Sequence, residues 1–196
     1  FTNMTHDIRT SLTLINAPIE ELSKEKNLSD EGRCYLNLAT EQAERLSSVA
    51  NQLLDFQKAD IGKSHIFWAM NDLVRIVSQR KLMFDAAASK QRIKLLFSSN
   101  CESYLTAVDE LKIEKGIDNL LSNAIKYSHP DGEVLINLKC EPNRWILEVR
   151  DQGLGISENA QQKLFREFYR GDNVVNSTIV GSGIGLLLVK NYVAMH

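Results

Sequence analysis

The chain of 196 residues lacks several features that mark other classes of protein. Its three cysteines, Cys34, Cys101 and Cys140, lie far apart without a CxxC pair, which excludes a zinc or redox motif built on paired cysteines. Its four histidines are also scattered. No apolar run reaches 18 residues, so no segment is expected to span a membrane. A net charge of −2 argues against strong electrostatic binding of nucleic acid.

The first residues also lack the signals of a processed or complete protein. FTNMTHDIRT contains no charged start and no apolar block, so no signal peptide is predicted. It contains no initiator methionine, and we therefore expect the sequence to be a fragment of something longer. Apolar residues make up 43% and charged residues 24% of the chain, which is the balance of an ordinary folded protein.

Apolar residues in the first 60 positions recur at helical spacing in two segments. They are three or four residues apart between Phe1 and Leu22, and again between Leu36 and Phe56. Two such helices joined by a short polar turn form an antiparallel hairpin. Because a hairpin cannot bury both apolar stripes alone, we expect two copies to dimerise as a four-helix bundle. The alternative is a hairpin that folds back on the rest of its own chain.

A different pattern begins after a hinge around Gly62, which divides the chain into residues 1–61 and 62–196. Helices are predicted at 71–89, 110–127, 158–166 and from 183 onward, and strands at 93–97, 103–108, 133–139 and 144–150. Helices and strands interleave without regular βαβ spacing. We therefore predict an α + α/β protein, in which the helical hairpin precedes an α/β sandwich with a mixed sheet.

Glycines cluster at two places in this second part. The segment DQGLG (151–155) follows a predicted strand, and GSGIGL (181–186) precedes a predicted helix. Such glycine spacing lets backbone N–H groups approach an anion, and a helix N-terminus adds a partial positive charge. Neither cluster is a P-loop, because no Gly-Lys-Ser/Thr follows. Leu186 also stands where a Rossmann fingerprint has its third glycine.

The predicted helix at 110–127 has a polar face. Asn119 and Asn123 are four residues apart on this face, and Lys126 follows Asn123 by three residues. An amide oxygen suits a hard cation and an ammonium group attracts phosphate, so these residues are candidate ligands of a polyphosphate with Mg²⁺. The alternative is that they are only a helix cap and solvated helix surface.

In this order and spacing, the motifs resemble those of sensor histidine kinases, whose catalytic ATP-binding domain belongs to the GHKL ATPase superfamily. DNLLSNAIKYS (118–128) is similar to the N-box, DQGLG to the first glycine box, LFREFYR (164–170) to the phenylalanine box, and GSGIGLLLVK (181–190) to the second glycine box. HDIRTSLTLI (6–15) resembles the H-box of the dimerisation and phosphotransfer domain. The resemblance covers nearly the whole chain.

The resemblance implies a protein-histidine kinase that uses ATP and Mg²⁺. His6 is then the phosphoacceptor, and Asp7 orients its ring or takes its proton. Thr10 positions water for dephosphorylation of a partner protein, which implies a phosphatase activity. The expected partners are a second copy of the chain and a response-regulator receiver domain, whose aspartate accepts the phosphoryl group. The expected location is the cytoplasmic portion of an inner-membrane sensor kinase, either hybrid or simple.

The resemblance also assigns nucleotide contacts. Asn123 is the Mg²⁺ ligand, Asn119 and Lys126 lie near the phosphates, and Tyr127 lies beside the nucleotide. The remaining contacts follow the glycine and phenylalanine boxes. Asp151 accepts a hydrogen bond from the adenine amino group, Arg170 lies near the γ-phosphate, and residues 171–180 form a lid. The backbone approaches the nucleotide at Gly153, Gly155, Gly181, Ser182, Gly183, Gly185 and Leu186.

Two other functions are considered for the same motifs. One is a GHKL ATPase whose ATP hydrolysis drives conformational change, and the pair His6 and Asp7 argues against it because such enzymes need no such histidine. The other is a nucleotide-binding dimer scaffold without phosphotransfer, against which Asn123, Asp151 and the glycine boxes argue. Related kinases continue past position 196 with two further strands, so the sheet is expected to lack its C-terminal strands.

Overall fold

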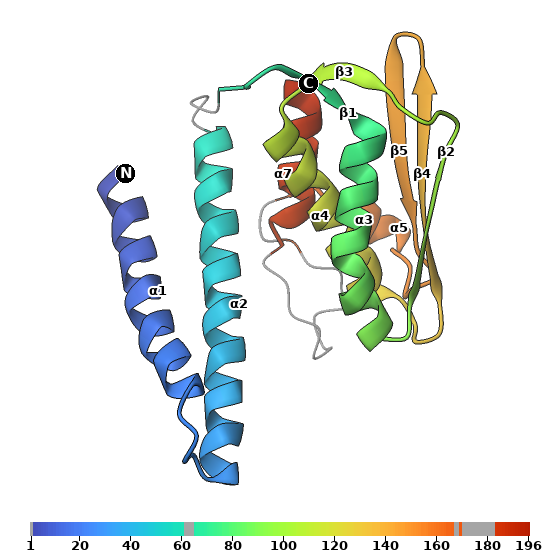
Figure 1. Cartoon of the computed structure of the whole chain (residues 1–196). Coiled ribbons are helices and arrows are strands. Elements are labelled where there is room, and N and C mark those ends of the chain that lie inside the picture. The colour runs from blue at the N-terminus through green and yellow to red at the C-terminus, as the bar shows by residue number, and fades with distance from the viewer. Residues whose placement is uncertain (1, 61–64, 167–168, 170–182) are drawn as a thin grey trace. The chain divides into compact units, whose positions relative to one another are not determined.

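The computed structural model describes residues 2–60, 65–166, 169 and 183–196, and for 2–9 and 57–60 it describes only the helical backbone (Figure 1). The chain divides into two compact units, Phe1–Lys63 and Ser64–His196, and each is described by itself. Among the described helices, none is both long and apolar enough to cross a membrane.

The first unit is a hairpin of two helices, α1 (Thr2–Ser23) and α2 (Asp30–Asp60). The hydroxyl of Ser29 accepts a hydrogen bond from the Gly32 N–H at 3.0 Å and so caps the start of α2. Asp30 and Glu31 follow in the first turn, where their negative charges favour the helix dipole. A hydrogen bond of 3.2 Å from the Asn16 amide to the Ser47 hydroxyl joins the two helices.

The hairpin leaves much of its apolar surface uncovered. Leu12, Ala43, Leu54 and Phe56 are buried. The large apolar side chains that stay exposed on the same two helices are Leu14, Ile15, Leu22, Tyr35, Leu38 and Leu46. Ile15, Leu22 and Leu46 belong to the predicted apolar stripes, so one chain alone leaves part of each stripe exposed.

The second unit combines helices with two small sheets. Its elements are β1 (Ala69–Asp72), α3 (Leu73–Lys90), β2 (Lys94–Ser99), β3 (Leu105–Val108), α4 (Glu110–Tyr127), β4 (Glu133–Glu141), β5 (Arg144–Arg150), α5 (Glu158–Gln161) and α7 (Gly185–Met195). β1 and β3 pair antiparallel as one sheet. The other sheet has the order β2-β4-β5, in which β2 and β4 are parallel and β4 and β5 antiparallel. Helices α3, α4 and α7 lie on one side of this sheet (Figure 1).

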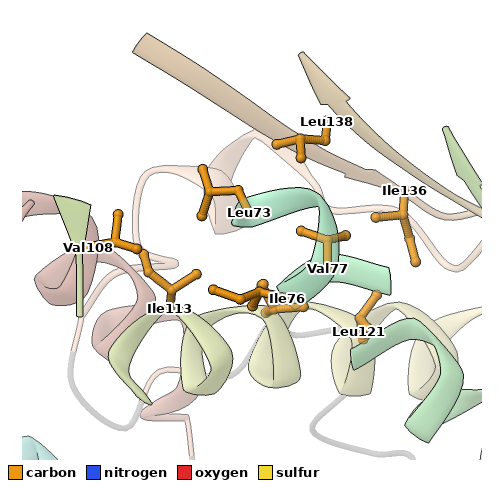
Figure 2. Close-up of a cluster of buried hydrophobic side chains, with 9 residues drawn as sticks. Leu73, Ile76, Val77, Val108, Ile113, Leu121, Ile136 and Leu138 are labelled. Carbon is orange, nitrogen blue, oxygen red and sulfur yellow. The ribbon is translucent and has the colours of Figure 1, made fainter. Parts of the chain in front are cut away.

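The core of the second unit lies between α3, α4 and the helix-facing side of β4. Leu73, Ile76 and Val77 of α3 meet side chains of α4 and β4 there (Figure 2). The cluster is completed by the buried residues Val108, Ile113, Ile117, Leu121, Ile136 and Leu138. These side chains recur every three or four residues in the helices and every second residue in β4, which is the pattern of elements with one buried face.

The start of α4 is held by a buried carboxylate. Asp109, which is 3% exposed, accepts hydrogen bonds from the Lys112 N–H at 3.2 Å, the Lys112 ammonium at 2.6 Å and the Phe67 N–H at 3.0 Å. The Lys112 ammonium also donates to the His65 carbonyl at 2.7 Å. The Asp109 N–H donates to Nε2 of His196, which lies just after the end of α7. This cluster ties residues 65–67 and the end of α7 to the start of α4.

The predicted fold class, a helical part followed by a mixed sheet with helices, is confirmed. The limits of the helix at 110–127 agree with those of α4. The dimeric bundle and the missing C-terminal strands stay predictions.

Two elements differ from the prediction. Residues 69–72 form a strand where the predicted helix began at 71, because they pair with β3. The predicted helix at 158–166 ends at Gln161. Beyond it the Lys163 N–H donates to the Ala160 carbonyl and the Arg166 N–H to the Lys163 carbonyl, so the hydrogen bonds span three residues instead of four.

We predict that Asp109→Ala lowers the free energy of unfolding by about 1–3 kcal/mol. The substitution removes the cap of α4 and leaves the Lys112 ammonium without its carboxylate partner. Asp109→Asn keeps an oxygen that can cap the helix, so it should lower the free energy of unfolding by less than Asp109→Ala does. Urea unfolding of the three chains measures both differences, and equal stability of Asp109→Ala and wild type would contradict the role given to this carboxylate.

The contribution of Asp109 should also depend on pH. Burial opposes its ionisation, but hydrogen bonds from Lys112 and Phe67 hold the pKa of the carboxyl below its ordinary value of 3.8. Because the folded state has the lower pKa, the stabilisation is full above the unfolded value and is lost as the pH falls through the folded pKa. The stability difference between wild type and Asp109→Asn should therefore shrink between neutral pH and about pH 3. An unchanged difference would contradict this pKa shift.

Candidate functional site

The second unit contains a pocket of about 540 Å³, a size typical of small-molecule sites. Four parts of the chain form its wall: the second half of α4, the end of β5 with the loop that follows, the region around α5, and the start of α7. Eight residues predicted from the sequence line it, namely Asn123, Lys126, Tyr127, Asp151, Gly155, Gly183, Gly185 and Leu186.

The wall that α4 contributes is polar at one edge. Asn123 and Lys126 both line the pocket and are half-buried. The Lys126 ammonium lies 4.8 Å from the centre of the Tyr127 ring, in cation–π contact with it. The opposite face of α4 carries buried Ile113, Ile117 and Leu121. Burial of that face sets the rotation of the helix and so directs the polar edge toward the pocket.

Asn119 has different surroundings from Asn123, which follows it by one turn of α4. Its amide N–H donates to the Lys115 carbonyl of the same helix at 2.8 Å. Its oxygen lies against the start of α7, where a Cβ added to Gly185 would come within 2.6 Å of it. Asn119 therefore lies against Gly185 at the start of α7 and does not line the pocket, whereas Asn123 does.

The loop after β5 is held close to the end of α4. The Gly153 N–H donates to the Asp151 carboxylate at 3.0 Å, and the Leu154 N–H donates to the Tyr127 carbonyl at 3.1 Å. A Cβ on Gly153 would lie 2.2 Å from that same carbonyl oxygen, so only glycine fits this approach. Gly155 has a φ of +66°, which also favours glycine. The Asp151 side chain is exposed at the pocket.

The start of α7 supplies backbone N–H groups. Gly183 has a φ of +72°, and Gly185 and Leu186 line the pocket in the first turn of the helix. Among the residues that the structure describes, no side chain makes a capping hydrogen bond at this end of α7. The first N–H groups of a helix carry a partial positive charge, so this end of α7 is suited to an anion in the pocket.

Several predicted residues are not placed by the structure. Gly181, Ser182, Arg170 and the predicted lid at 171–180 lie outside the described residues. His6 and Asp7 lie within the backbone of α1, and only their backbone is described. Thr10 is described and is exposed on α1. Gly153 does not line the pocket, although its contact with Tyr127 shapes the adjacent loop.

Several wall residues were not predicted from the sequence. They are Leu120, Ala124, Val149, Arg150, Leu154, Ile156, Ala160, Gln161, Leu164 and Tyr169. Leu154 falls inside the first glycine box, and Leu164 and Tyr169 fall inside the phenylalanine box, so their positions in those motifs were available as a signal. Val149 and Arg150 had only strand alternation, which does not distinguish a pocket wall from a sheet face.

The residues present fit a nucleoside triphosphate with Mg²⁺. Apolar Leu120, Leu154 and Ile156 suit a flat base, and the exposed Asp151 carboxylate can accept a hydrogen bond from an amino group. The Asn123 amide oxygen suits a hard cation. The Lys126 ammonium and the glycine-rich start of α7 suit phosphates. The close fit of Gly185 against Asn119 brings the α7 backbone next to α4, where a side chain would fill the gap.

Two protein families match the chain. The His Kinase A (phospho-acceptor) domain family matches residues 1–62, and the Histidine kinase-, DNA gyrase B-, and HSP90-like ATPase family matches residues 108–196. The sensor protein kinase WalK of Staphylococcus aureus is 30% identical over 200 residues, which cover 99% of this chain and 47% of that protein. The chain spans between 13% and 47% of the length of the first curated relatives that it matches.

Solved structures share the fold. The full-length ShkA structure in complex with AMPPNP has a TM-score of 0.83 and 23% identity, over 98% of this chain and 40% of that chain. The histidine kinase ThkA in complex with response regulator protein TrrA has a TM-score of 0.60 and 20% identity, over 86% of this chain and 49% of that chain. Because the sequence identities are below 25%, these similarities show a shared fold and nothing more.

Two glycine substitutions test the geometry of the site. Gly153→Ala should lower the free energy of unfolding by roughly 1–3 kcal/mol, because its Cβ would overlap the Tyr127 carbonyl oxygen. The matched control is Gly116→Ala inside α4, where a Cβ would meet nothing within 4 Å and stability should rise by roughly 0.5–1 kcal/mol. Thermal unfolding of both variants measures the two changes. A neutral Gly153→Ala would contradict the close approach of the loop to α4.

Proposed function

The chain belongs to the histidine kinases, and we propose that it is the ATP-dependent kinase core of a two-component sensor. It phosphorylates its own His6 and passes the phosphoryl group to an aspartate of a response-regulator receiver domain. Residues 1–61 are the dimerisation and phosphotransfer hairpin, and residues 62–196 are the catalytic domain. The proposal rests chiefly on the pocket in Ser64–His196, whose wall combines Asn123, Lys126 and Asp151 with the glycine-rich start of α7.

Asp151 and the apolar wall residues bind the base in this proposal. The hydrogen bond from the Gly153 N–H orients the Asp151 carboxylate. The carboxylate then accepts a hydrogen bond from the amino group of adenine. A guanine base presents a carbonyl oxygen at that place, so the carboxylate favours ATP over GTP. Tyr127 and Gly155 lie beside the base along the same wall.

Asn123, Asn119 and Lys126 serve the phosphate end. Asn123 offers its amide oxygen to Mg²⁺, while Lys126 supplies a positive charge to the phosphates. Asn119 acts with them by keeping the α7 backbone at Gly185 next to α4. Bound Mg²⁺ neutralises part of the phosphate charge and favours attack at phosphorus. Gly183 and Leu186 line the same part of the pocket. By their positions in the motifs, Gly181 and Ser182 are assigned to the phosphates and Arg170 to the charge that develops during transfer.

His6 is the nucleophile of the proposed reaction. A neutral imidazole nitrogen attacks the γ-phosphorus, so that an N–P bond forms while the bond to the bridging oxygen breaks and ADP leaves. Asp7, the next residue in α1, orients the ring or takes the proton from its other nitrogen. Thr10 positions water for a second, opposing activity, which is the dephosphorylation of a receiver domain.

The first unit supports a homodimer. Ile15, Leu22 and Leu46 are exposed apolar residues of the two helical stripes, and a second hairpin packed against them forms a four-helix bundle. The His Kinase A match over residues 1–62 agrees with this assignment of the hairpin.

The receiver partner and the location are proposed from the relatives. ThkA was solved with response regulator protein TrrA, which supports a receiver domain as the partner of this chain. WalK is a sensor protein kinase, which supports a sensor as the parent of this chain. We propose that the chain is the cytoplasmic portion of an inner-membrane sensor. A membrane anchor would then belong to a part of the parent sensor outside residues 1–196.

The proposal is tested by incubating the chain with γ-labelled ATP and Mg²⁺. The chain should acquire label that is labile in acid and stable in alkali, as expected for a phosphoramidate. His6→Ala should lose this label completely yet still bind ATP, because the substitution leaves the pocket intact. His65→Ala, which removes an exposed histidine of the other unit, is the matched control and should keep the label.

A third variant, Asp151→Asn, tests nucleotide binding in the pocket. It turns the acceptor for the adenine amino group into an amide, and ATP affinity should fall by at least about tenfold, with a corresponding loss of label at limiting ATP. Label that persists in His6→Ala would overturn the phosphoacceptor. ATP hydrolysis without any label would favour a GHKL ATPase, and ATP binding without either reaction would favour a dimer scaffold.

A further inference from the structure

Two cysteines that the proposed kinase reaction does not use are neighbours at the end of the three-stranded sheet, Cys101 two residues after β2 and Cys140 within β4. β2 and β4 are parallel, with Ser99 paired to Leu138 at the last position of the ladder. Cys101 and Cys140 each follow this pair by two residues along the chain. Neighbouring strands are about 4.8 Å apart, which is within the range of Cα separations that a disulfide can bridge.

The side chain of Asn100 holds the residues that follow β2 beside Cys140 of β4. Its amide N–H donates to the Cys140 carbonyl at 3.0 Å, and its oxygen accepts the Cys140 N–H at 2.7 Å. The Asn100 N–H donates to the Leu138 carbonyl at 3.4 Å. Asn100 thus brackets the backbone of Cys140, and Cys101 is the next residue along the chain.

The two neighbouring thiols have different surroundings. The Ser99 hydroxyl lies 3.5 Å from the Cys101 sulfur and accepts the Cys101 N–H at 3.3 Å, which bends the chain after β2. Cys140 is paired with Trp145 across β4 and β5 and packs against the edge of the core. Burial raises the pKa of the Cys140 thiol to about 11, with a further contribution from the neighbouring Cys101 side chain. Both cysteines are half-buried free thiols.

We propose that Cys101 and Cys140 are an oxidation site, at which a peroxide converts the two thiols into a reversible disulfide within one chain. The Cys101 thiolate attacks one peroxide oxygen, so that an S–O bond forms, the O–O bond breaks and water leaves after protonation. The Cys140 sulfur then attacks the sulfenic sulfur, the S–S bond forms and a second water leaves. The two sulfurs lose two electrons to the peroxide, and a dithiol reductant reverses the change.

The order of the two steps follows from the surroundings of each thiol. The Cys140 thiol, whose pKa is raised, is protonated at neutral pH and is a poor first nucleophile. Cys140 therefore acts second, as the resolving group, and its proton leaves with the sulfenic hydroxyl as water. The oxidised pair would tether the segment after β2 to β4. That segment also carries Tyr104, whose N–H donates to Asp72 at the start of α3 and whose hydroxyl donates to the Glu141 carbonyl.

The test uses the full chain with Cys34→Ser, which removes the exposed third cysteine and its possible cross-links between chains. After treatment with hydrogen peroxide, thiols are counted under denaturing conditions. Both remaining thiols should disappear. Mass spectrometry should find one peptide that joins Cys101 to Cys140 and is lighter by two hydrogens than its reduced parts, and dithiothreitol should restore both thiols.

Two comparisons distinguish a built site from random oxidation. The disulfide should form on the order of ten times faster in the native chain than in the same chain unfolded in urea, because the fold raises the effective concentration of one thiol at the other. Cys34→Ser with Cys101→Ser should retain the Cys140 thiol under the same treatment. Equal rates in native and unfolded chains, persistence of both thiols, or separate oxidation of each cysteine without a cross-link would overturn the proposal.

Discussion

Burial of one face of α4 is the constraint on which the candidate site depends. Ile113, Ile117 and Leu121 pack into the core with α3 and β4, so the rotation of the helix about its own axis is set. Arg80 of α3 adds a two-point hydrogen bond to Asp118, with 2.7 Å between Nε and Oδ1. Asn123 and Lys126 reach the pocket because these earlier residues of the same helix hold it in this orientation. The polar function of the helix therefore rests on its apolar packing.

The same helix shows why part of the fold could be predicted from the sequence. Its apolar residues recur at helical spacing, which is a local signal, and the predicted limits agree with the structure, in which Asp109 caps the first turn. Strand β1 has no local signal of this kind, because its four residues become a strand only by pairing with β3, more than 30 positions later. Helix α5 was predicted too long, because the turns after Gln161 keep a helical sequence pattern with shorter hydrogen-bond spacing.

The sequence predicted which types of residue form the candidate site better than it predicted the contacts that these residues make. The glycines and amides were found because each motif has a fixed spacing in the sequence. The reason for Gly153 is steric, since the loop passes within contact distance of the Tyr127 carbonyl, and no spacing in the sequence contains that information. Likewise Asn119 and Asn123 share a helix face, but only the packing of α7 distinguishes them, by placing Gly185 against Asn119. The apolar wall of the pocket is formed by segments that are far apart in the sequence, so it could be recognised only in the folded structure.

In the proposed function, α4, the loop after β5 and the start of α7 together bind ATP. Hydrogen–deuterium exchange of the chain with and without ATP and Mg²⁺ tests this binding site segment by segment, with Asp151→Asn as the control. We expect slower exchange at 119–127, 151–155 and 183–186 when the nucleotide is added to the wild-type chain, and a much smaller change in Asp151→Asn at the same concentration. Unchanged exchange in all three segments, or equal protection in Asp151→Asn, would show that the nucleotide does not bind in this way.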